Sequence, residues 1–177
     1  MRTLYLCRHA KSSWADPGQD DFDRPLNERG LRNAPFMARL FKERGEKLDL
    51  MVTSTAARAL ATARFFAQEL GAKETPAFDP SAPRPQLLLD ANLYHASIRT
   101  ILGVVNGLPD ATSHVMLFGH NPGFTDAVVY FGNEDLDNLP TCGIVRIDFP
   151  IDSWKMAARD LGMLVWRDHP KRHPGQG

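Results

Sequence analysis

The chain has 177 residues, 43% of them hydrophobic, and its 21 basic residues balance 21 acidic ones. This length suits one compact domain with a single core and leaves little room for two. A net charge of zero excludes a long-range field that would attract nucleic acid or an anionic membrane, so any basic site has to be local.

No apolar run approaches the roughly 18 residues that span a bilayer, and the first ten residues read as a strand, not as a signal peptide. The two cysteines, Cys7 and Cys142, are far apart and predict small buried side chains without a disulfide framework. We therefore expect a cytoplasmic protein with neither nucleic acid nor membrane as a partner.

Short apolar runs predict strands, and helical periodicity predicts helices. Asn27 is a suitable cap for the first helix, in which Pro35 predicts a kink or a late start, and Ser54 or Thr55 is expected to cap the next. The predicted elements, in chain order, are a strand over 4–7, a loop over 14–24, a helix over 31–44, a strand over 48–53, a helix over 57–70 closed by Gly71, a proline-rich excursion over 75–86, a strand over 87–89, a helix capped by Ser97 and running to about Asn106, a strand over 115–118, a helix over 124–131, and strands over 143–149 and 161–166.

This alternation of buried strands and helices predicts a three-layer α/β/α fold with a mostly parallel central sheet. We expect a single domain over residues 1–168 and a flexible tail over 169–177. Ligands of such sheets bind outside the carboxyl ends of the strands. Three predicted strand ends carry polar, chemistry-bearing residues: Arg8-His9, the stretch 54–58, and Gly119-His120.

The absence of several motifs narrows the chemistry. There is no Walker loop, no GxGxxG, no HExxH, no CxxC and no GxSxG. A cysteine phosphatase needs an Arg six positions after its Cys, but Ser13 and Asp148 stand there. The pair Asp21 and Asp23 has the spacing of an aspartyl phosphatase, but it follows a polar loop instead of an apolar strand.

Two His and two Arg at strand ends remain, and they suit phosphoryl transfer. Arginine makes forked, charge-assisted hydrogen bonds to phosphate oxygens, and Arg58 is expected in the first turn of its helix, where an anion is favoured. A neutral imidazole can attack phosphorus and carry the phosphoryl group. A second imidazole and the two guanidinium groups can stabilise the transferred charge without a metal.

Four segments in this order resemble the histidine phosphatase superfamily: LYLCRHA, RPLNERG, STAARALATA and GHNPG. The short length, the RHA form of the first segment and the KSSW that follows it look most like the SixA-like phosphohistidine phosphatase branch, and less like the longer phosphoglycerate mutases. The resemblance covers roughly residues 1–130. It implies the same α/β/α fold, hydrolase activity and no metal or other cofactor.

Carried over by position, the resemblance implies that His9 is the nucleophile and is transiently phosphorylated. Arg8, Arg58 and His120 would complete the phosphate pocket, and Ser12 would have a minor binding role. Taken alone, each of these residues could have a structural role instead of a catalytic one. Arg8-His9 could be a structural pair, Arg58 a solvated helix residue and His120 a turn histidine. We expect Lys11 at the rim of the phosphate pocket.

The proton donor is not placed by any motif. Asp90 is a possible general acid, although a turn or capping role is the simpler interpretation, and the loop acids Asp16, Asp20 and Asp21 are other candidates. The loop aspartates are most simply a solvated surface. Phosphohistidine has a better leaving group than an alkyl phosphate and demands less acid catalysis. An absent acid would therefore fit a phosphohistidine substrate.

The sequence thus predicts a phosphatase with a covalent phosphohistidine intermediate, acting on a phosphorylated protein or on a small phosphorylated metabolite. A phosphomonoesterase or mutase of the same superfamily is one alternative. A phosphate- or phosphoprotein-binding module without turnover is another, and the intact His9 counts against it. Tyr94 and His95 are candidates for the mouth of the pocket. His169 and His173 have a spacing that could hold a metal, but their Pro-rich, basic context favours a solvated tail.

Overall fold

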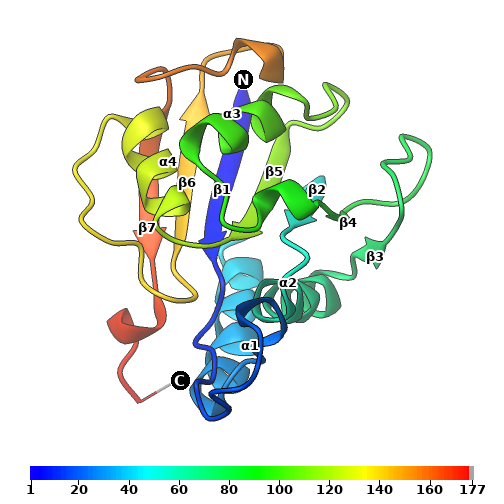
Figure 1. Ribbon diagram of the computed structural model, residues 1–177. Helices are drawn as coiled ribbons and strands as arrows, with labels where there is room; N and C mark the ends of the chain where they lie inside the picture. Colours follow the sequence, from blue (N-terminus) through cyan, green and yellow to red (C-terminus); the bar gives the residue numbers. More distant parts are fainter. Residues whose placement is uncertain (176–177) are drawn as a thin grey trace.

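A computed structural model describes residues 1–175 and confirms the three-layer α/β/α fold (Figure 1). The central sheet has seven strands in the order β3-β4-β2-β5-β1-β6-β7. Pairing is parallel from β3 to β1 and antiparallel for β6 and β7. The strands are β1 (Arg2–Arg8), β2 (Leu50–Thr53), β3 (Lys73–Glu74), β4 (Gln86–Leu89), β5 (His114–Gly119), β6 (Ile144–Phe149) and β7 (Met163–Asp168). The α-helices are α1 (Glu28–Glu43), α2 (Ala57–Leu70), α3 (Ile98–Asn106) and α4 (Gly123–Gly132).

The two faces of the sheet are covered by different helices. Alternate residues of β1 point to opposite faces, as the strand period requires. Tyr5 and Cys7 join the core made with α1 and α2, whereas Leu4 and Leu6 join the core made with α3 and α4. In Figure 1, α3 and α4 lie in front of the strands. Because β1 is buried on both faces, its carboxyl end is a rigid support for the residues that follow it.

Helix starts show where local patterns held and where they did not. Asn27 caps α1 as predicted, its side-chain oxygen accepting the Gly30 N–H at 2.9 Å, and Ser97 caps α3. Helix α1 begins at Glu28, so the late start predicted from Pro35 is wrong. The proline lies inside the helix. The predicted cap of α2 is also wrong. Its N-cap is Ala56, which has no side-chain acceptor, and Ser54 lies two residues before it with its hydroxyl 2.8 Å from His120 Nε2.

The C-terminal segment differs from the expected flexible tail as far as it is described. A 3-10 helix, η4 (Pro170–Arg172), follows β7, and Pro170 is buried. The His173 ring nitrogen Nε2 lies 2.9 Å from the buried Asp168 carboxylate, and its ring packs edge-on against Phe36 of α1. Residues 169–175 are therefore folded back onto α1; residues 176–177 lie outside the described range.

No helix among residues 1–175 is both long enough and apolar enough to cross a membrane. Cys7 and Cys142 are both free and buried, as the sequence predicts.

Gly30 provides a test of how α1 is held against the loop after β1. A Cβ built on Gly30 would stand 2.1 Å from the Lys11 carbonyl oxygen, which is backbone and cannot move aside alone. We predict that Gly30→Ala lowers the free energy of unfolding by about 1–3 kcal/mol, the usual range for overpacking. Gly103→Ala, in α3 with nothing within 4 Å of the added Cβ, is the control. It should be neutral or stabilising by up to about 1 kcal/mol. Urea unfolding of both variants measures the change in the free energy of unfolding. Equal changes in the two variants would contradict the close approach of Gly30 to Lys11.

Candidate active site

The carboxyl ends of β1, β5 and β2, three neighbouring parallel strands, meet at one edge of the sheet. Arg8 ends β1 and His9 follows it, His120 follows β5, and Arg58 stands in the first turn of α2 after β2. The sheet order therefore brings together residues that are more than a hundred positions apart in sequence. They line a cavity of about 290 Å³, whose lining residues are Arg8, His9, Lys11, Ser12, Trp14, Asp21, Arg24, Arg58, His95, His120, Asn121 and Thr141.

His9 is 7% exposed and its orientation is fixed by the backbone. Its Nδ1 lies 2.7 Å from the Ala10 carbonyl oxygen, which can only accept, so Nδ1 carries the proton. The other ring nitrogen, Nε2, then carries the lone pair. Burial, together with the positive charges of Arg58 and Arg8, lowers the pKa of His9 to about 3. His9 is consequently neutral at physiological pH.

His120 lies beside it, with the two ring centroids 5.2 Å apart. Its Nε2 is 2.8 Å from the Ser54 hydroxyl oxygen, and that oxygen accepts the Ala56 N–H at 3.3 Å, which leaves the hydroxyl hydrogen free to donate to Nε2. Burial, together with the nearby His9 and the positive charge of Arg58, lowers the pKa of His120 to about 3. Among residues 1–175, no acceptor lies within hydrogen-bond distance of its buried Nδ1.

Two guanidinium groups complete this half of the cavity. Arg58 is 2% exposed, and its Nη2 donates to Asp21 Oδ2 at 2.9 Å while Nη1 donates to the Asp21 backbone carbonyl. Arg8 donates from Nη1 to the Leu139 carbonyl at 2.8 Å. The Nε of each arginine is buried and has no acceptor within the described chain. With His120 Nδ1, three buried nitrogen atoms around His9 therefore lack a hydrogen-bond partner, which is unusual in a folded protein.

Asp21 is the counter-charge of the cavity, and not the solvated loop residue that the sequence suggests. Its Oδ2 also accepts from the Tyr94 hydroxyl at 2.9 Å and lies 3.1 Å from His95 Nε2. Partial burial favours the neutral acid, but hydrogen bonds from Tyr94, Arg24 and Arg58 outweigh it and hold the pKa of Asp21 well below its ordinary value. Asp21 is therefore an ionised carboxylate.

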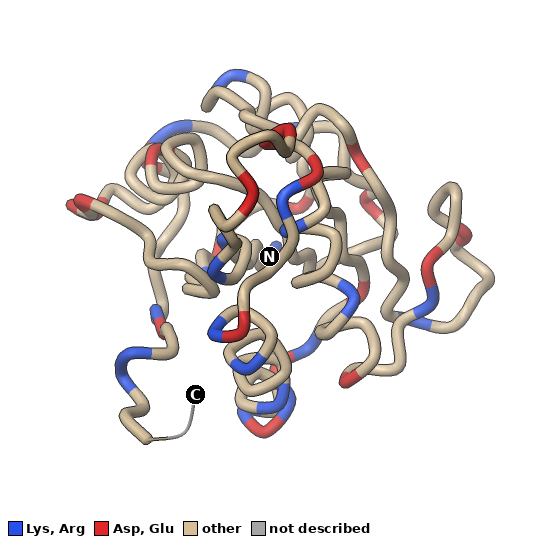
Figure 2. The backbone as a smooth tube through the Cα atoms, turned by 60° about the horizontal axis from the view of Figure 1, so that its bottom comes forward, with Lys and Arg blue, Asp and Glu red and all other residues tan. Residues whose placement is uncertain are grey.

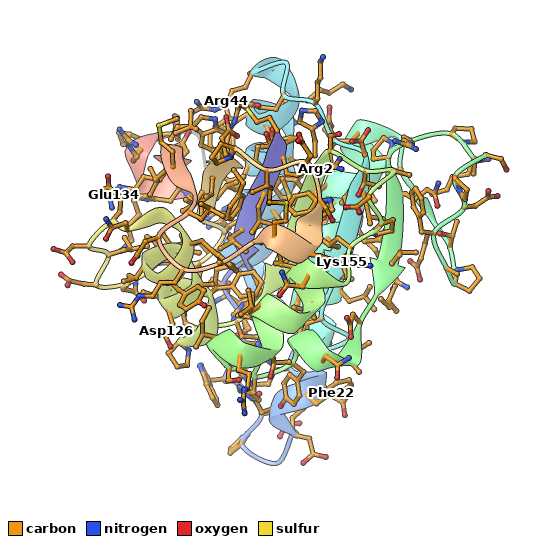
Figure 3. The ribbon with its side chains drawn as sticks, turned by 90° about the horizontal axis from the view of Figure 1, so that it is seen from above. Arg2, Phe22, Arg44, Asp126, Glu134 and Lys155 are labelled. Carbon is orange, nitrogen blue, oxygen red and sulfur yellow. The ribbon has the colours of Figure 1, made fainter. Side chains whose placement is uncertain are left out.

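The loop that carries Asp21 is fastened to the opposite side of the site. Phe22 packs edge-on against Tyr94, with ring centroids 5.1 Å apart. Figure 3 shows Phe22 beneath the segment that leads into α3. The φ of His95, +48°, lies in the left-handed region that non-glycine residues seldom adopt. Tyr94 and His95, expected at the mouth, are thus the anchor for this loop.

Arg24 is a site residue to which the sequence reasoning gave no role. It donates to the Ser12 hydroxyl at 2.7 Å and to Asp21 Oδ1 at 2.9 Å, and its guanidinium stacks 3.6 Å from the centre of the exposed Trp14 ring. Ser12 is buried and lines the cavity, with its hydroxyl held by Arg24. The signal was present, because Arg24 opens the RPLNERG segment. Asn121 lies in the GHNPG segment and had the same kind of signal, whereas Thr141 lies in none of the four segments.

Asp90 does not join this group. Its Oδ1 accepts the Asn92 N–H at 2.9 Å and caps a 3-10 helix, η2 (Ala91–Leu93). Asp90 lines a different hollow, which is bounded by helix α3 and strands β2 and β4. The structure therefore supports the capping interpretation of Asp90 and not the general acid. Within residues 1–175 no group of three or more His, Cys, Asp or Glu is arranged to hold a metal ion.

These features give an α/β protein with a candidate phosphate site at the carboxyl edge of its sheet, and known proteins of similar sequence and fold can be compared with it. The sequence model of the histidine phosphatase superfamily (branch 1) matches residues 4–80. An uncharacterised chloroplastic protein of Arabidopsis thaliana is 29% identical over 94% of this chain and 75% of its own length. A candidate phosphohistidine phosphatase SixA from Agrobacterium tumefaciens has a TM-score of 0.76 at 29% identity, covering 96% of this chain and 98% of that one.

Two more distant structures share the fold. A protein histidine phosphatase SixA complexed with tungstate has a TM-score of 0.76 at 16% identity, over 96% of this chain and 98% of that one. A mycobacterial glucosyl-3-phosphoglycerate phosphatase has a TM-score of 0.63 at 13% identity, over the same shares of the two chains. The match over residues 4–80 and the likeness to the SixA structure from Agrobacterium tumefaciens over nearly the whole chain support a phosphatase related to the histidine phosphatase superfamily, similar to its SixA-like branch.

The low pKa values of His9 and His120 predict an acid sensitivity of folding. In the unfolded chain both imidazoles have the ordinary pKa of 6.5, whereas in the folded protein both stay neutral until about pH 3. The unfolded chain therefore binds more protons between these values, and the free energy of unfolding falls as pH decreases through this window. Above pH 6.5 the two histidines contribute nothing to the pH dependence.

We predict that His9→Asn and His120→Asn each reduce the loss of stability between pH 6.5 and about pH 4.5, measured by urea unfolding at fixed pH values. This window lies above the ordinary carboxyl pKa of 3.8, so Asp21 adds little there. An unaltered slope in both site variants would show that the two imidazoles are not buried as neutral groups.

Proposed function

We propose that this phosphatase hydrolyses phosphohistidine in proteins through a covalent intermediate on His9. The observation that carries the proposal is the composition of the cavity. It presents a neutral imidazole with a free lone pair among unpaired N–H donors, and its one carboxylate among the described residues is ionised. Such a site is suited to accept a phosphoryl group and poorly suited to protonate a demanding leaving group.

In the first step, His9 Nε2 attacks phosphorus and forms a P–N bond while the P–N bond to the substrate imidazole breaks. The departing imidazole nitrogen takes a proton from water. In the second step, water attacks the phosphorus of phospho-His9, the P–N bond breaks, and inorganic phosphate leaves while His9 returns to its neutral form. The Ala10 carbonyl supports both steps. It holds the proton on Nδ1 of His9, and it stays hydrogen-bonded to the positively charged ring that forms when Nε2 is phosphorylated.

The charge of the transferred group is stabilised by the three nitrogen atoms without acceptors. Arg8 and Arg58 supply guanidinium charge, and the Ser54 hydroxyl, by donating to His120 Nε2, leaves Nδ1–H of His120 to donate to a phosphoryl oxygen. When substrate binds, Arg58 Nη2 releases its hydrogen bond to Asp21 Oδ2 and donates to a phosphoryl oxygen instead. Ser12, held by Arg24, lies at the same wall and assists binding.

The state of Asp21 favours a P–N over a P–O substrate. Asp90 lines a different hollow, and Asp21 is kept ionised by Arg24, Arg58 and Tyr94, so neither is a ready proton donor. An imidazole leaves phosphorus with less help than an alkoxide does. We also propose that the protein works in the cytoplasm, where its free cysteines stay reduced.

One contact favours a second candidate, a phosphomonoesterase acting on a small phosphorylated metabolite. His95 and Asp21 form a hydrogen-bonded pair in the cavity wall, and such a pair can shuttle a proton to an alkoxide oxygen. The two candidates differ in whether Asp21 is needed for turnover.

His9→Ala should reduce the turnover of a phosphohistidine peptide by at least about a thousandfold, because the nucleophile is lost. Rapid acid-free quenching and mass spectrometry of the wild type should place the phosphoryl group on His9. His114→Ala, an equivalent change outside the cavity, should retain wild-type turnover. Full activity of His9→Ala, or phosphorylation at another residue, would disprove the assignment.

Asp21→Asn should tighten the inhibition by inorganic phosphate about threefold to tenfold, because Arg58 no longer pairs with a competing anion. The asparagine keeps a side-chain oxygen acceptor and the backbone carbonyl that binds Arg58, so the loop stays anchored and turnover of the phosphohistidine peptide should stay within about threefold of wild type. The matched control is Asp20→Asn in the same loop, an exposed acid outside the cavity lining. A drop of about a hundredfold or more, confined to an alkyl phosphate such as glycerol phosphate, whose alkoxide leaving group needs a proton, would instead identify Asp21 as part of an acid catalyst for esters.

A further inference from the structure

A second hollow, of about 200 Å³, adjoins the active-site cavity and is called here the basic groove. It lies between the start of α1 and the C-terminal segment, and Thr141 lines both hollows. Its lining residues are Arg29, Arg32, Asn33, Pro140, Thr141, His169, Pro170, Lys171, His173, Pro174 and Gly175. None of them is acidic.

The cations of the basic groove are not neutralised by the protein. Arg29, Arg32 and Lys171 are exposed, and within residues 1–175 no carboxylate lies within the 4.0 Å of an ion pair with any of them. The nearby Asp168 is buried beneath the segment and is already held by Arg44 and His173. The outer surface of the groove therefore carries three unpaired positive charges.

This local excess stands out against a chain whose total charge is zero. Figure 2 marks Lys and Arg positions on the C-terminal segment and on α1, and α1 and η4 are in contact. The hollow on the far side of Pro140 and His169 is lined by Asp135 and Asp137 as well as by Arg167 and Arg172, so the purely basic surface ends there. In the other direction, Thr141 joins the groove to the active-site cavity, whose lining includes Lys11.

We propose that the basic groove docks an acidic stretch of the phosphoprotein substrate beside its phosphohistidine. The proposal rests on the function proposed above and adds the chemistry that the partner presents. A phosphohistidine in the cavity would place the neighbouring residues of its own protein over Thr141 and onto Arg29, Arg32 and Lys171. Carboxylates there would meet positive charges that have no other partner, which raises the rate of encounter and fixes the orientation of the bound protein.

The form of the groove favours a protein over the second anionic group of a small metabolite. Sites for small anions enclose the ligand and present buried, preorganised donors. The three cations here are long, exposed side chains, and they belong to two separate segments of an open surface. Exposed charges of this kind steer and orient a large partner, each contributing modestly.

The test uses a triple charge reversal, Arg29→Glu, Arg32→Glu and Lys171→Glu, none of which touches the nucleophile or the phosphate ligands. The matched control is Lys47→Glu, Arg99→Glu and Lys155→Glu, which reverses three exposed charges outside the groove and the active-site cavity. The probes are two phosphohistidine peptides, one flanked by Glu and one by Gln, and para-nitrophenyl phosphate.

We expect the groove variant to lose about tenfold or more in kcat/KM for the Glu-flanked peptide. It should remain within about twofold for the Gln-flanked peptide and para-nitrophenyl phosphate, and the control should resemble the wild type throughout. The wild-type preference for the Glu-flanked peptide should also weaken as salt is added, because exposed charges are screened. An equal loss on all three probes, or no loss on any, would overturn the proposal.

A binding measurement separates this proposal from the proposed function. Fluorescence anisotropy with a labelled, unphosphorylated Glu-flanked peptide needs no turnover. Binding to the wild type and to the control variant, weakened about tenfold in the groove variant, supports the groove even if phosphohistidine proves not to be the substrate. If the phosphohistidine peptides are hydrolysed but the labelled peptide binds the groove variant as well as the wild type, the groove proposal fails and the proposed function stands.

Discussion

The ion pair between Arg58 and Asp21 is the interaction on which the candidate site depends. A guanidinium that is 2% exposed would be costly to bury without a negative partner, and Asp21 supplies both its carboxylate and its backbone carbonyl. The same carboxylate binds Tyr94 and Arg24, so it joins the loop after β1, the start of α2 and the segment before α3. One charge therefore holds three separate parts of the chain around His9.

This arrangement also sets the protonation state of His9, the proposed nucleophile. His9 is buried among Arg8, Arg24 and Arg58, and the pKa of about 3 follows from that burial and from their positive charges. A protonated imidazole could not attack phosphorus, so the cationic surroundings that bind a phosphoryl group also keep its acceptor reactive. Asp21 offsets part of this positive charge and, for the same reason, competes with phosphate for Arg58. The same carboxylate therefore anchors the loop and lowers the affinity of the site for phosphate.

The residues that could be predicted from sequence are those fixed by strand ends. Apolar runs identify β1, β2 and β5, and parallel pairing forces their carboxyl ends together, so Arg8, His9, Arg58 and His120 converge without any knowledge of loops. The resemblance to a known family supplied their roles, and those roles remain proposals.

What could not be predicted depends on contacts distant in sequence. Asp21 lies in a polar loop like its neighbours Asp20 and Asp23, and only the packing of Phe22 on Tyr94 carries it to Arg58. Ser54 has the local pattern of a helix cap, yet its hydroxyl supports His120 from across the sheet edge. For Asp90, the local pattern already favoured a turn cap, which is the role that the structure assigns to it.

The segment 138–142 links the active-site cavity to the basic groove. The Leu139 carbonyl holds Arg8, and the Cys142 N–H donates to the Arg8 and His9 carbonyl oxygens at 3.0 and 3.1 Å. Cys142 has a φ of +58°, a strained conformation for a non-glycine residue, and its buried side chain keeps it in place. Thr141, between these two anchors, faces both hollows. Under the two proposals, a partner seated on the groove would rest on the same short stretch of backbone that positions His9 and Arg8, so recognition of the protein and placement of its phosphoryl group would share one support.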